Sequence, residues 1–171
     1  MDRATATSAI SATGRVFAMM DADGDGVVSA HDYLSRIDRT VHATGRTEGD
    51  PLVVTARAEG RQAWGAMDSN GDGTLTFDEY DAWVDADKFD NICRSALGSL
   101  FDLADADGDG ALDKAEFTML RTALNNSPGN AAAAFDALDA DGDGWVGRDA
   151  YLAAIRAYIF GDSSPMGEAL Y

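Results

Sequence analysis

Cysteine, long apolar runs and a targeting segment are all scarce or missing in this chain of 171 residues. The single cysteine, Cys93, excludes an internal disulfide framework and fits a reducing compartment, and we expect its thiol to be buried. No apolar run reaches the roughly 18 residues that a membrane span requires. The N-terminus lacks the basic-then-apolar order of a signal peptide, so we expect a cytoplasmic protein without membrane contact.

Basic residues are also few, because 13 Lys and Arg stand against 30 Asp and Glu, a formal net charge of -17. Such a charge repels nucleic acid and anionic lipid, so neither is an expected partner. The cations are mostly arginine, and alanine and glycine are abundant, a bias that we associate with a GC-rich bacterial genome. We therefore expect a bacterial protein, and we expect a monomer.

Catalytic constellations are absent as well. The sequence has no Ser/His/Asp order, no glycine-rich phosphate loop and no paired carboxylates outside four acidic loops. Neither His31 nor His42 has a second His or Cys at metal-ligand spacing, and we expect both to be exposed. We predict that the protein is not an enzyme.

The four acidic loops hold 17 of the 30 acidic residues, and residues 105–116 show their chemistry best. Carboxylates at alternate positions converge on one point, while Gly110 permits a sharp turn. The last carboxylate, on the first turn of the next helix, can give two oxygens, and Asp113 can act through water. This is a set of oxygen ligands for a hard cation. The predicted ligands are the side chains of Asp105, Asp107, Asp109 and Glu116 and the carbonyl of Ala111.

This is the EF-hand pattern, D-x-[DN]-x-[DN]-G-x5-E, and further copies begin at Asp21, Asp68 and Asp139. One isolated match can be a solvated turn, but four copies in register predict Ca²⁺ sites. The second loop, residues 68–79, is complete like the third. Its predicted ligands are Asp68, Asn70, Asp72, the Thr74 carbonyl and Glu79, with Thr76 acting through water.

The first and fourth loops are both altered at position twelve. Asp32 is one methylene shorter than glutamate, which predicts weaker calcium binding and better tolerance of Mg²⁺ as a competitor. Ala150 supplies no carboxylate and Asp149 is turned about 100° around the helix, so we expect a weak or empty fourth site. The other first-loop ligands are Asp21, Asp23, Asp25 and the Val27 carbonyl. The other fourth-loop ligands are Asp139, Asp141, Asp143 and the Trp145 carbonyl.

Apolar residues recur at fixed places around each loop. One aromatic stands four residues before each loop and another follows it, which predicts core positions that pack paired hands together. A large apolar residue at position eight predicts an antiparallel bridge of the first hand with the second and of the third with the fourth. The aromatics are Phe17, Trp64, Phe101 and Phe135, then Tyr33, Tyr80, Phe117 and Tyr151. The position-eight residues are Val28, Leu75, Leu112 and Val146.

The connecting segments give weaker signals. We expect the first helix over residues 6–20, and an insert over residues 36–61 in which Asp50 caps a helix that starts at Pro51. For the basic residues of this insert we favour internal pairing or solvated faces over docking to an anionic partner. Residues 83–92 predict a bent or short-jointed helical connection. The basic residues are Arg36, Arg39, His42, Arg46, Arg57 and Arg61.

These features predict an all-α protein, with four EF-hands in two paired lobes that pack into a compact body and short β-bridges between paired loops. We place the N-terminal pair at residues 1–86, with loops 21–32 and 68–79. The C-terminal pair takes residues 87–171, with loops 105–116 and 139–150 and an apolar tail that needs a cover.

The four hands, the long interval between the first two loops and the tail resemble the sarcoplasmic calcium-binding protein group, which includes the bacterial calerythrins. The resemblance implies a cytoplasmic calcium buffer or signal modulator, and the loops predict about three bound calcium ions. The alternative is a sensor that exposes an apolar groove and regulates an unidentified target protein or enzyme. The modest methionine content argues against a Met-lined groove. A departure from the group is that the incomplete loop is the fourth.

Overall fold

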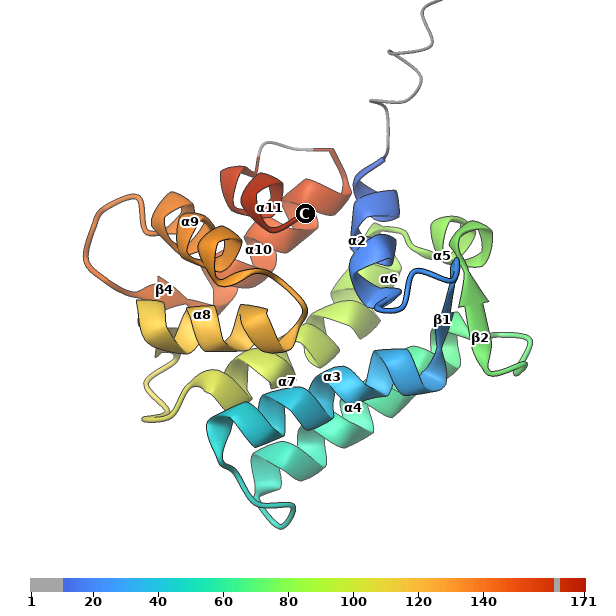
Figure 1. Cartoon of the computed structure of the whole chain (residues 1–171), viewed down its shortest axis with the longest axis horizontal. Helices are drawn as coiled ribbons and strands as arrows, with labels where there is room; N and C mark the ends of the chain where they lie inside the picture. Colours follow the sequence, from blue (N-terminus) through green and yellow to red (C-terminus); the bar gives the residue numbers. More distant parts are fainter. Residues whose placement is uncertain (1–10, 162–163) are drawn as a thin grey trace, which may run out of the picture.

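The computed structural model describes residues 11–161 and 164–171, and this part of the chain is mostly helical (Figure 1). The all-α prediction is confirmed. The helices are α2 (Ala12–Met20), α3 (Ala30–Thr44), α4 (Pro51–Met67), α5 (Phe77–Trp83), α6 (Ala86–Lys88), the π-helical η1 (Phe89–Cys93), α7 (Arg94–Ala104), α8 (Lys114–Ala123), α9 (Pro128–Leu138), α10 (Arg148–Ile159) and α11 (Pro165–Leu170). The strands are β1 (Val27–Ser29), β2 (Thr74–Thr76), β3 (Ala111–Leu112) and β4 (Val146–Gly147). None of the described helices combines the length and the hydropathy that a membrane crossing needs.

Helix starts follow the capping residues that the sequence provides. The carboxylate of Asp50 accepts from the backbone N–H of Leu52 at 2.9 Å, and Pro51 is the first residue of α4, as predicted. The predicted first helix differs, because Ser11 is extended and its hydroxyl accepts from the Gly14 N–H, so α2 begins at Ala12. Residues 6–10 of that prediction lie outside the described residues.

The strands form two short antiparallel pairs, as predicted from position eight of the loops. Val28 faces Leu75 where β1 meets β2, and Leu112 faces Val146 where β3 meets β4. All four of these side chains are buried. Figure 1 shows the two strand pairs on opposite sides of the molecule, so the loops form two pairs that lie far apart.

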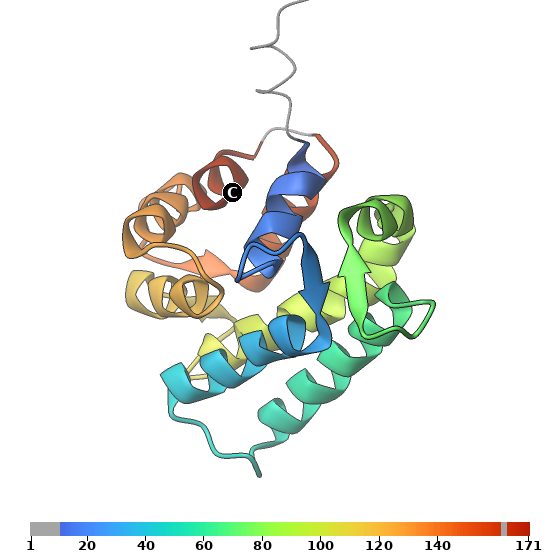
Figure 2. The ribbon, with the colours of Figure 1, turned by 45° about the vertical axis from the view of Figure 1, so that its right-hand side comes forward.

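The core consists of two hydrophobic clusters, and all eight predicted aromatics are buried in them. One cluster joins the first two hands around Phe17, Trp64 and Tyr80. The other joins the last two hands around Phe101 and Phe117, and it also takes in residues from α3 and α4. Figures 1 and 2 show α3 and α4 running together beneath α7. The body is therefore compact, while the boundary between residues 86 and 87 stays a prediction.

The link between the two pairs of hands is a jointed helical connection, as predicted. Helix α5 ends at Trp83, and the Asp85 carboxylate then accepts from the Lys88 N–H at 2.8 Å to start α6. The chain continues through η1 directly into α7 without a loop. The connection is consequently continuous backbone structure, not a free tether.

The apolar tail is covered by its own last helix. Helix α11 packs against α9 and α10, and both Met166 and Leu170 are buried. The Ser164 hydroxyl caps α11 through the Gly167 N–H and also donates to the Ala154 carbonyl at 2.7 Å. The tail thus closes over the C-terminal hands.

Two arginines of the basic insert, Arg46 and Arg57, pair with carboxylates of the same chain. Arg57 binds the carboxylates of Asp38 and Glu48, each at 2.7 Å. Arg46 donates from Nε to the Leu103 carbonyl at 2.8 Å and from Nη2 to the carbonyls of Asp102 and Asp105 at 3.4 and 3.1 Å. Arg46 therefore caps the C-terminal end of α7, where the helix dipole favours a cation.

Candidate metal centre

All four acidic loops adopt the same turn, which the glycine at position six makes possible. These glycines have φ between 80° and 90°, a region that side chains disfavour. Each donates its backbone N–H to the carboxylate at position one of the same loop. The pairs are Gly26 with Asp21 at 2.9 Å, Gly73 with Asp68 at 3.0 Å, Gly110 with Asp105 at 2.8 Å and Gly144 with Asp139 at 3.0 Å.

Three of the loops bring three carboxylates together. In each, ligand oxygens at positions one, three and five lie within 4.8 Å of one another. The groups are Asp21, Asp23 and Asp25; Asp105, Asp107 and Asp109; and Asp139, Asp141 and Asp143. Oxygens this close suit a divalent cation, which takes several carboxylates at once.

The electrostatics of the fourth loop reflect the closeness of its carboxylates. Desolvation, together with the neighbouring carboxyls of Asp141 and Asp143, raises the pKa of Asp139, although the Gly144 N–H opposes the shift. Anions held this close repel one another, and a bound divalent ion would relieve the repulsion.

The second loop replaces the middle carboxylate with Asn70. The amide Nδ2 of Asn70 donates to Asp72 Oδ2 at 3.3 Å and to Glu79 Oε1 at 3.2 Å, so the amide holds two predicted ligands in place. Asp68 Oδ1 is buried and has no hydrogen-bond partner among the described residues. A buried carboxylate oxygen without a partner is costly, and a cation in the loop would satisfy it. The residues of this loop therefore fit a calcium ion.

Position twelve distinguishes the loops. Glu116 spans its loop, since Oε2 accepts from the Asp113 N–H at 3.0 Å and Oε1 from the Ala106 N–H at 3.4 Å. Glu79 likewise accepts from the Thr76 N–H at 2.9 Å while its other oxygen reaches Asn70. Both glutamates thus place two oxygens along the open side of their loops.

At position twelve of the first loop, the shorter Asp32 side chain bonds to the backbone at the start of its own helix. Asp32 Oδ2 accepts from the Ser29 N–H at 3.1 Å, which completes the capping box of α3. In the fourth loop no side chain caps α10 at Gly147, and Ala150 has no oxygen to offer. Asp149 is exposed and binds Arg94 Nη2 at 3.1 Å. Its carboxylate is turned away from the loop, in line with the helical spacing.

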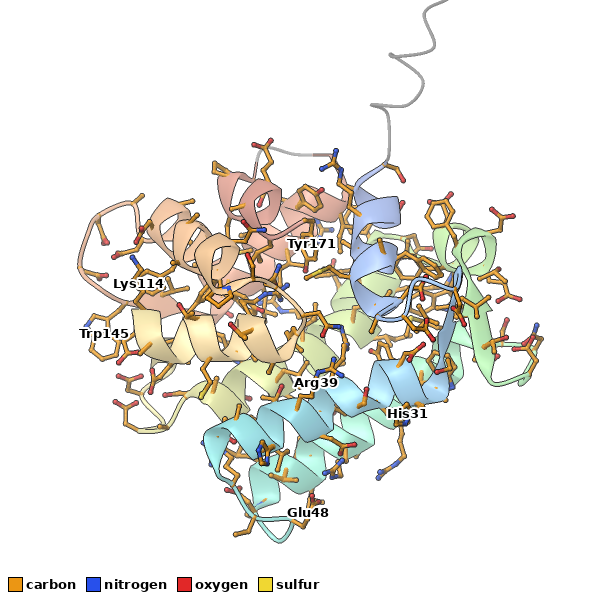
Figure 3. All side chains as sticks on the ribbon, viewed as in Figure 1. His31, Arg39, Glu48, Lys114, Trp145 and Tyr171 are labelled. Carbon is orange, nitrogen blue, oxygen red and sulfur yellow. The ribbon has the colours of Figure 1, made fainter. Side chains whose placement is uncertain are left out.

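Four residues are predicted to bind through their backbone carbonyls. Each stands at position seven of its loop, two residues after the carboxylate at position five. Their N–H groups donate to that carboxylate at 2.9 or 3.0 Å, and three of the four lie in the short strands. The residues are Val27, Thr74, Ala111 and Trp145. Trp145 precedes β4 and its side chain is exposed at the edge of the molecule (Figure 3).

Sequence reasoning missed one contact at the third loop. The Asp105 carbonyl, at the start of this loop, accepts from Arg46 in the first hand's insert. No local pattern predicts it, because the two residues are 59 positions apart. The histidines follow the expectation, since His31 and His42 are both exposed. Cys93 is only half-buried, but burial raises the pKa of its thiol to about 11.

Helix-loop-helix pairs joined by a short strand bridge, with an acidic loop in each hand, define an EF-hand protein. Family models agree. The EF-hand domain pair model matches residues 94–156, and the EF hand model matches residues 15–35 and 65–84. The matched segments include all four loops. The chain belongs to the EF-hand family, it is a calcium-binding protein, and its cofactor is Ca²⁺.

The curated relatives include calcium-binding proteins. The chain is 35% identical to calcium-binding protein CML23 of Oryza sativa subsp. japonica over 71 residues, which are 42% of this chain and 47% of that protein. It is 28% identical to calcineurin B of Naegleria gruberi over 112 residues, 65% of this chain and 55% of that protein. The chain spans about half the length of these curated relatives.

Solved structures with the same fold include bacterial and animal proteins. A Streptomyces coelicolor calcium-binding protein, which serves prokaryotic calcium-mediated regulation, has a TM-score of 0.72 and 28% identity over 86% of this chain and 96% of its own. The photoprotein mitrocomin of the jellyfish Mitrocoma cellularia has a TM-score of 0.74 and 20% identity over 94% of this chain and 89% of its own. The second likeness is one of fold alone.

Proposed function

We propose that this protein is a cytoplasmic calcium buffer or signal modulator that binds about three calcium ions. The proposed stoichiometry rests on the number of oxygens that the residue at position twelve of each loop can offer. Glu79 and Glu116 each offer two oxygens, Asp32 is shorter and Ala150 offers none. The similarity to the Streptomyces protein and the arginine-rich composition support a bacterial origin.

Calorimetric titration of the calcium-free chain should give a stoichiometry near three. The two complete loops should bind in about the 10⁻⁸ to 10⁻⁵ M range, between cytosolic buffers and sensors. The first loop should be the weaker third site and the one most sensitive to added Mg²⁺, because Asp32 lowers the coordination number. Four equally tight sites, or fewer than two, would contradict the proposed ligand sets.

A buffering role is supported by the internal cover of the apolar surfaces. Helix α11 occupies the surface of α9 and α10, and the jointed connection through η1 packs against α4 and α7. A groove that is already filled has no free surface for a target helix. The compact body therefore favours a buffer that changes little on binding.

A fluorescent dye for exposed apolar surface tests this role. We expect dye emission to fall or stay level when calcium is added to the calcium-free chain, because the core should tighten without opening a groove. A large calcium-induced rise in emission would support a sensor instead. Magnesium serves as the matched ion, since it should occupy the first loop without filling the others.

A calcium sensor that regulates a target protein is the second candidate. Two observations favour it: the similarity to calcineurin B and the regulatory role of the Streptomyces protein. A pull-down with and without calcium discriminates the two. A specific partner that is retained only with calcium supports the sensor, and its absence supports the buffer. In neither case do we propose an enzyme.

A further inference from the structure

A small cavity of about 50 Å³ lies at the centre of the molecule, where the two pairs of hands meet. Its walls come from α2, α3, α4, α5, η1, α7, α8 and α10 and from the C-terminal residue. Most of the lining is apolar, and three methionines contribute to it: Met19, Met20 and Met67. Two arginines also line the cavity, Arg36 and Arg121. None of the four predicted calcium sites uses these side chains.

Arg121 is a buried cation without an anion. Its side chain is 2% exposed, and its described partners are all neutral. Nε donates to Asn126 Oδ1 at 2.8 Å, Nη1 to the Tyr151 hydroxyl at 3.0 Å and Nη2 to the Tyr171 hydroxyl at 3.3 Å. These three bonds use three of the five N–H donors of a guanidinium. Among the described residues no carboxylate forms an ion pair with Arg121.

Arg36 is the second arginine in the lining of the same cavity. It is half-buried, its guanidinium lies 4.4 Å from the centre of the Tyr33 ring, and Nε donates to the Tyr33 carbonyl at 3.3 Å. No ion pair involves Arg36 in the part of the chain that the structure describes. Two other arginines of the insert, Arg46 and Arg57, pair with carboxylates. Arg36 is therefore distinguished from them by facing an apolar hollow.

An arginine inside a protein stays charged, so burying it without a counterion costs free energy unless an anion is supplied. Here the cation borders an apolar hollow and keeps unused donors. We propose that the cavity binds a small monocarboxylate with an apolar body, its carboxylate held by Arg121, with Arg36 as the second cation of the cavity lining. Arginine recognises carboxylates through paired N–H donors, which suits this head group.

The volume sets the size of the ligand. A space of 50 Å³ holds a few water-sized groups, so a short acyl or single-ring body enters only if lining side chains move. Methionine side chains rearrange at low cost, and three of them line this space. Long-chain fatty acids exceed what such movement provides.

The cavity also touches the ends of the first two calcium loops. Met20 and Met67 directly precede position one of these loops, and Tyr33 and Tyr80 directly follow position twelve. A ligand in the cavity would therefore lie beside residues that flank both loops. The site itself does not depend on the calcium stoichiometry, so its test is made at one fixed, saturating calcium concentration.

The test compares acids with their neutral amides on the full chain. Butanoate is titrated against butanamide, and phenylacetate against phenylacetamide, with amide shifts of the protein followed by NMR. We expect at least one acid to bind roughly tenfold tighter than its amide, with shifts centred on Tyr80, Leu97 and Leu124, because the charged head group pairs with arginine. Equal binding of acid and amide in both pairs would overturn the proposal.

Variants separate the head-group and body contacts. Arg121→Met should remove the preference for the acid, while Arg61→Met, an exposed arginine outside the cavity, should leave it unchanged. Because Arg121→Met removes a buried network, Val16→Phe provides a second variant that fills the partly exposed wall formed by α2. We expect Val16→Phe to abolish the shifts caused by each acid that binds the wild-type chain. Acid binding that survives in Val16→Phe, or that Arg61→Met removes equally, contradicts this site.

Discussion

Replacing Ala150 with glutamate should give the fourth loop a tight calcium site, so that the variant binds one more ion than the wild-type chain. Asp139, Asp141 and Asp143 already place three oxygens within 4.8 Å of one another, and the Gly144 N–H orients Asp139. A glutamate at 150 starts α10 where Glu116 starts α8, and its carboxylate can accept from the uncapped Gly147 N–H. We expect the new site to fall in about the 10⁻⁷ to 10⁻⁵ M range of sensor hands.

Parallel calorimetry of wild type and variant measures the added ion, and emission of Trp145 inside the loop reports where it binds. Ala150→Gln is the matched control, because it has the same length and a single amide oxygen in place of a carboxylate. It should gain much less affinity than the glutamate. An unchanged number of ions in Ala150→Glu would show that position twelve is not what disables this loop.

Replacing Gly167 with alanine should loosen α11 and lower the free energy of unfolding by about 1–3 kcal/mol, the usual cost of overpacking. A Cβ at this position would lie 2.5 Å from Tyr158 Cβ and 2.6 Å from Tyr158 Cγ. These atoms sit at the base of the Tyr158 side chain, so rotating the ring cannot relieve the contact. The helix itself must move away from α10, which exposes Met166 and Leu170.

Thermal denaturation measures this loss, and a dye for apolar surface should bind the variant more strongly than wild type. Gly129→Ala is the matched control, since it lies near the start of another helix that begins with proline, and a Cβ there meets nothing within 4 Å. Alanine at 129 should be neutral or stabilising by up to about 1 kcal/mol. Equal melting temperatures for Gly167→Ala and wild type would contradict tight packing of α11.

The loops and their strand pairs could be predicted from the sequence because their determinants are local. Position six requires a residue that tolerates positive φ, position eight pairs with its counterpart, and the cap residues lie within one turn of the helix they start. Asp50 and Pro51, for example, define the start of α4 without help from the rest of the chain. The same locality makes Ala150 visible as a defect by comparison with Glu116.

The cavity and the burial of Arg121 could not be predicted in this way. Arg121 directly follows the apolar Leu120 in α8. Helical periodicity alone would allow an arginine at this position to lie on the surface. Its burial depends on the segment of α11 and on Tyr171, which follows that helix 50 residues after Arg121 and places its hydroxyl on the guanidinium. Asn126 completes the enclosure by donating to the Leu170 carbonyl at 2.6 Å. The predicted start of the first helix is wrong as well, because apolar periodicity does not distinguish the N-cap Ser11 from a residue inside the helix.

The contact of Arg46 with the end of α7 has a consequence for how the chain unfolds. The carbonyls at the C-terminal end of a helix have no hydrogen-bond partners within the helix. At the end of α7, the carbonyls of Asp102, Leu103 and Asp105 accept hydrogen bonds from Arg46 of the first hand's insert. Separating the two pairs of hands would leave those carbonyls without their donors, next to the start of the third loop, while Arg46 would keep only its bond to Asp50. Melting of either pair should therefore destabilise the other, which makes the four hands a single cooperative unit.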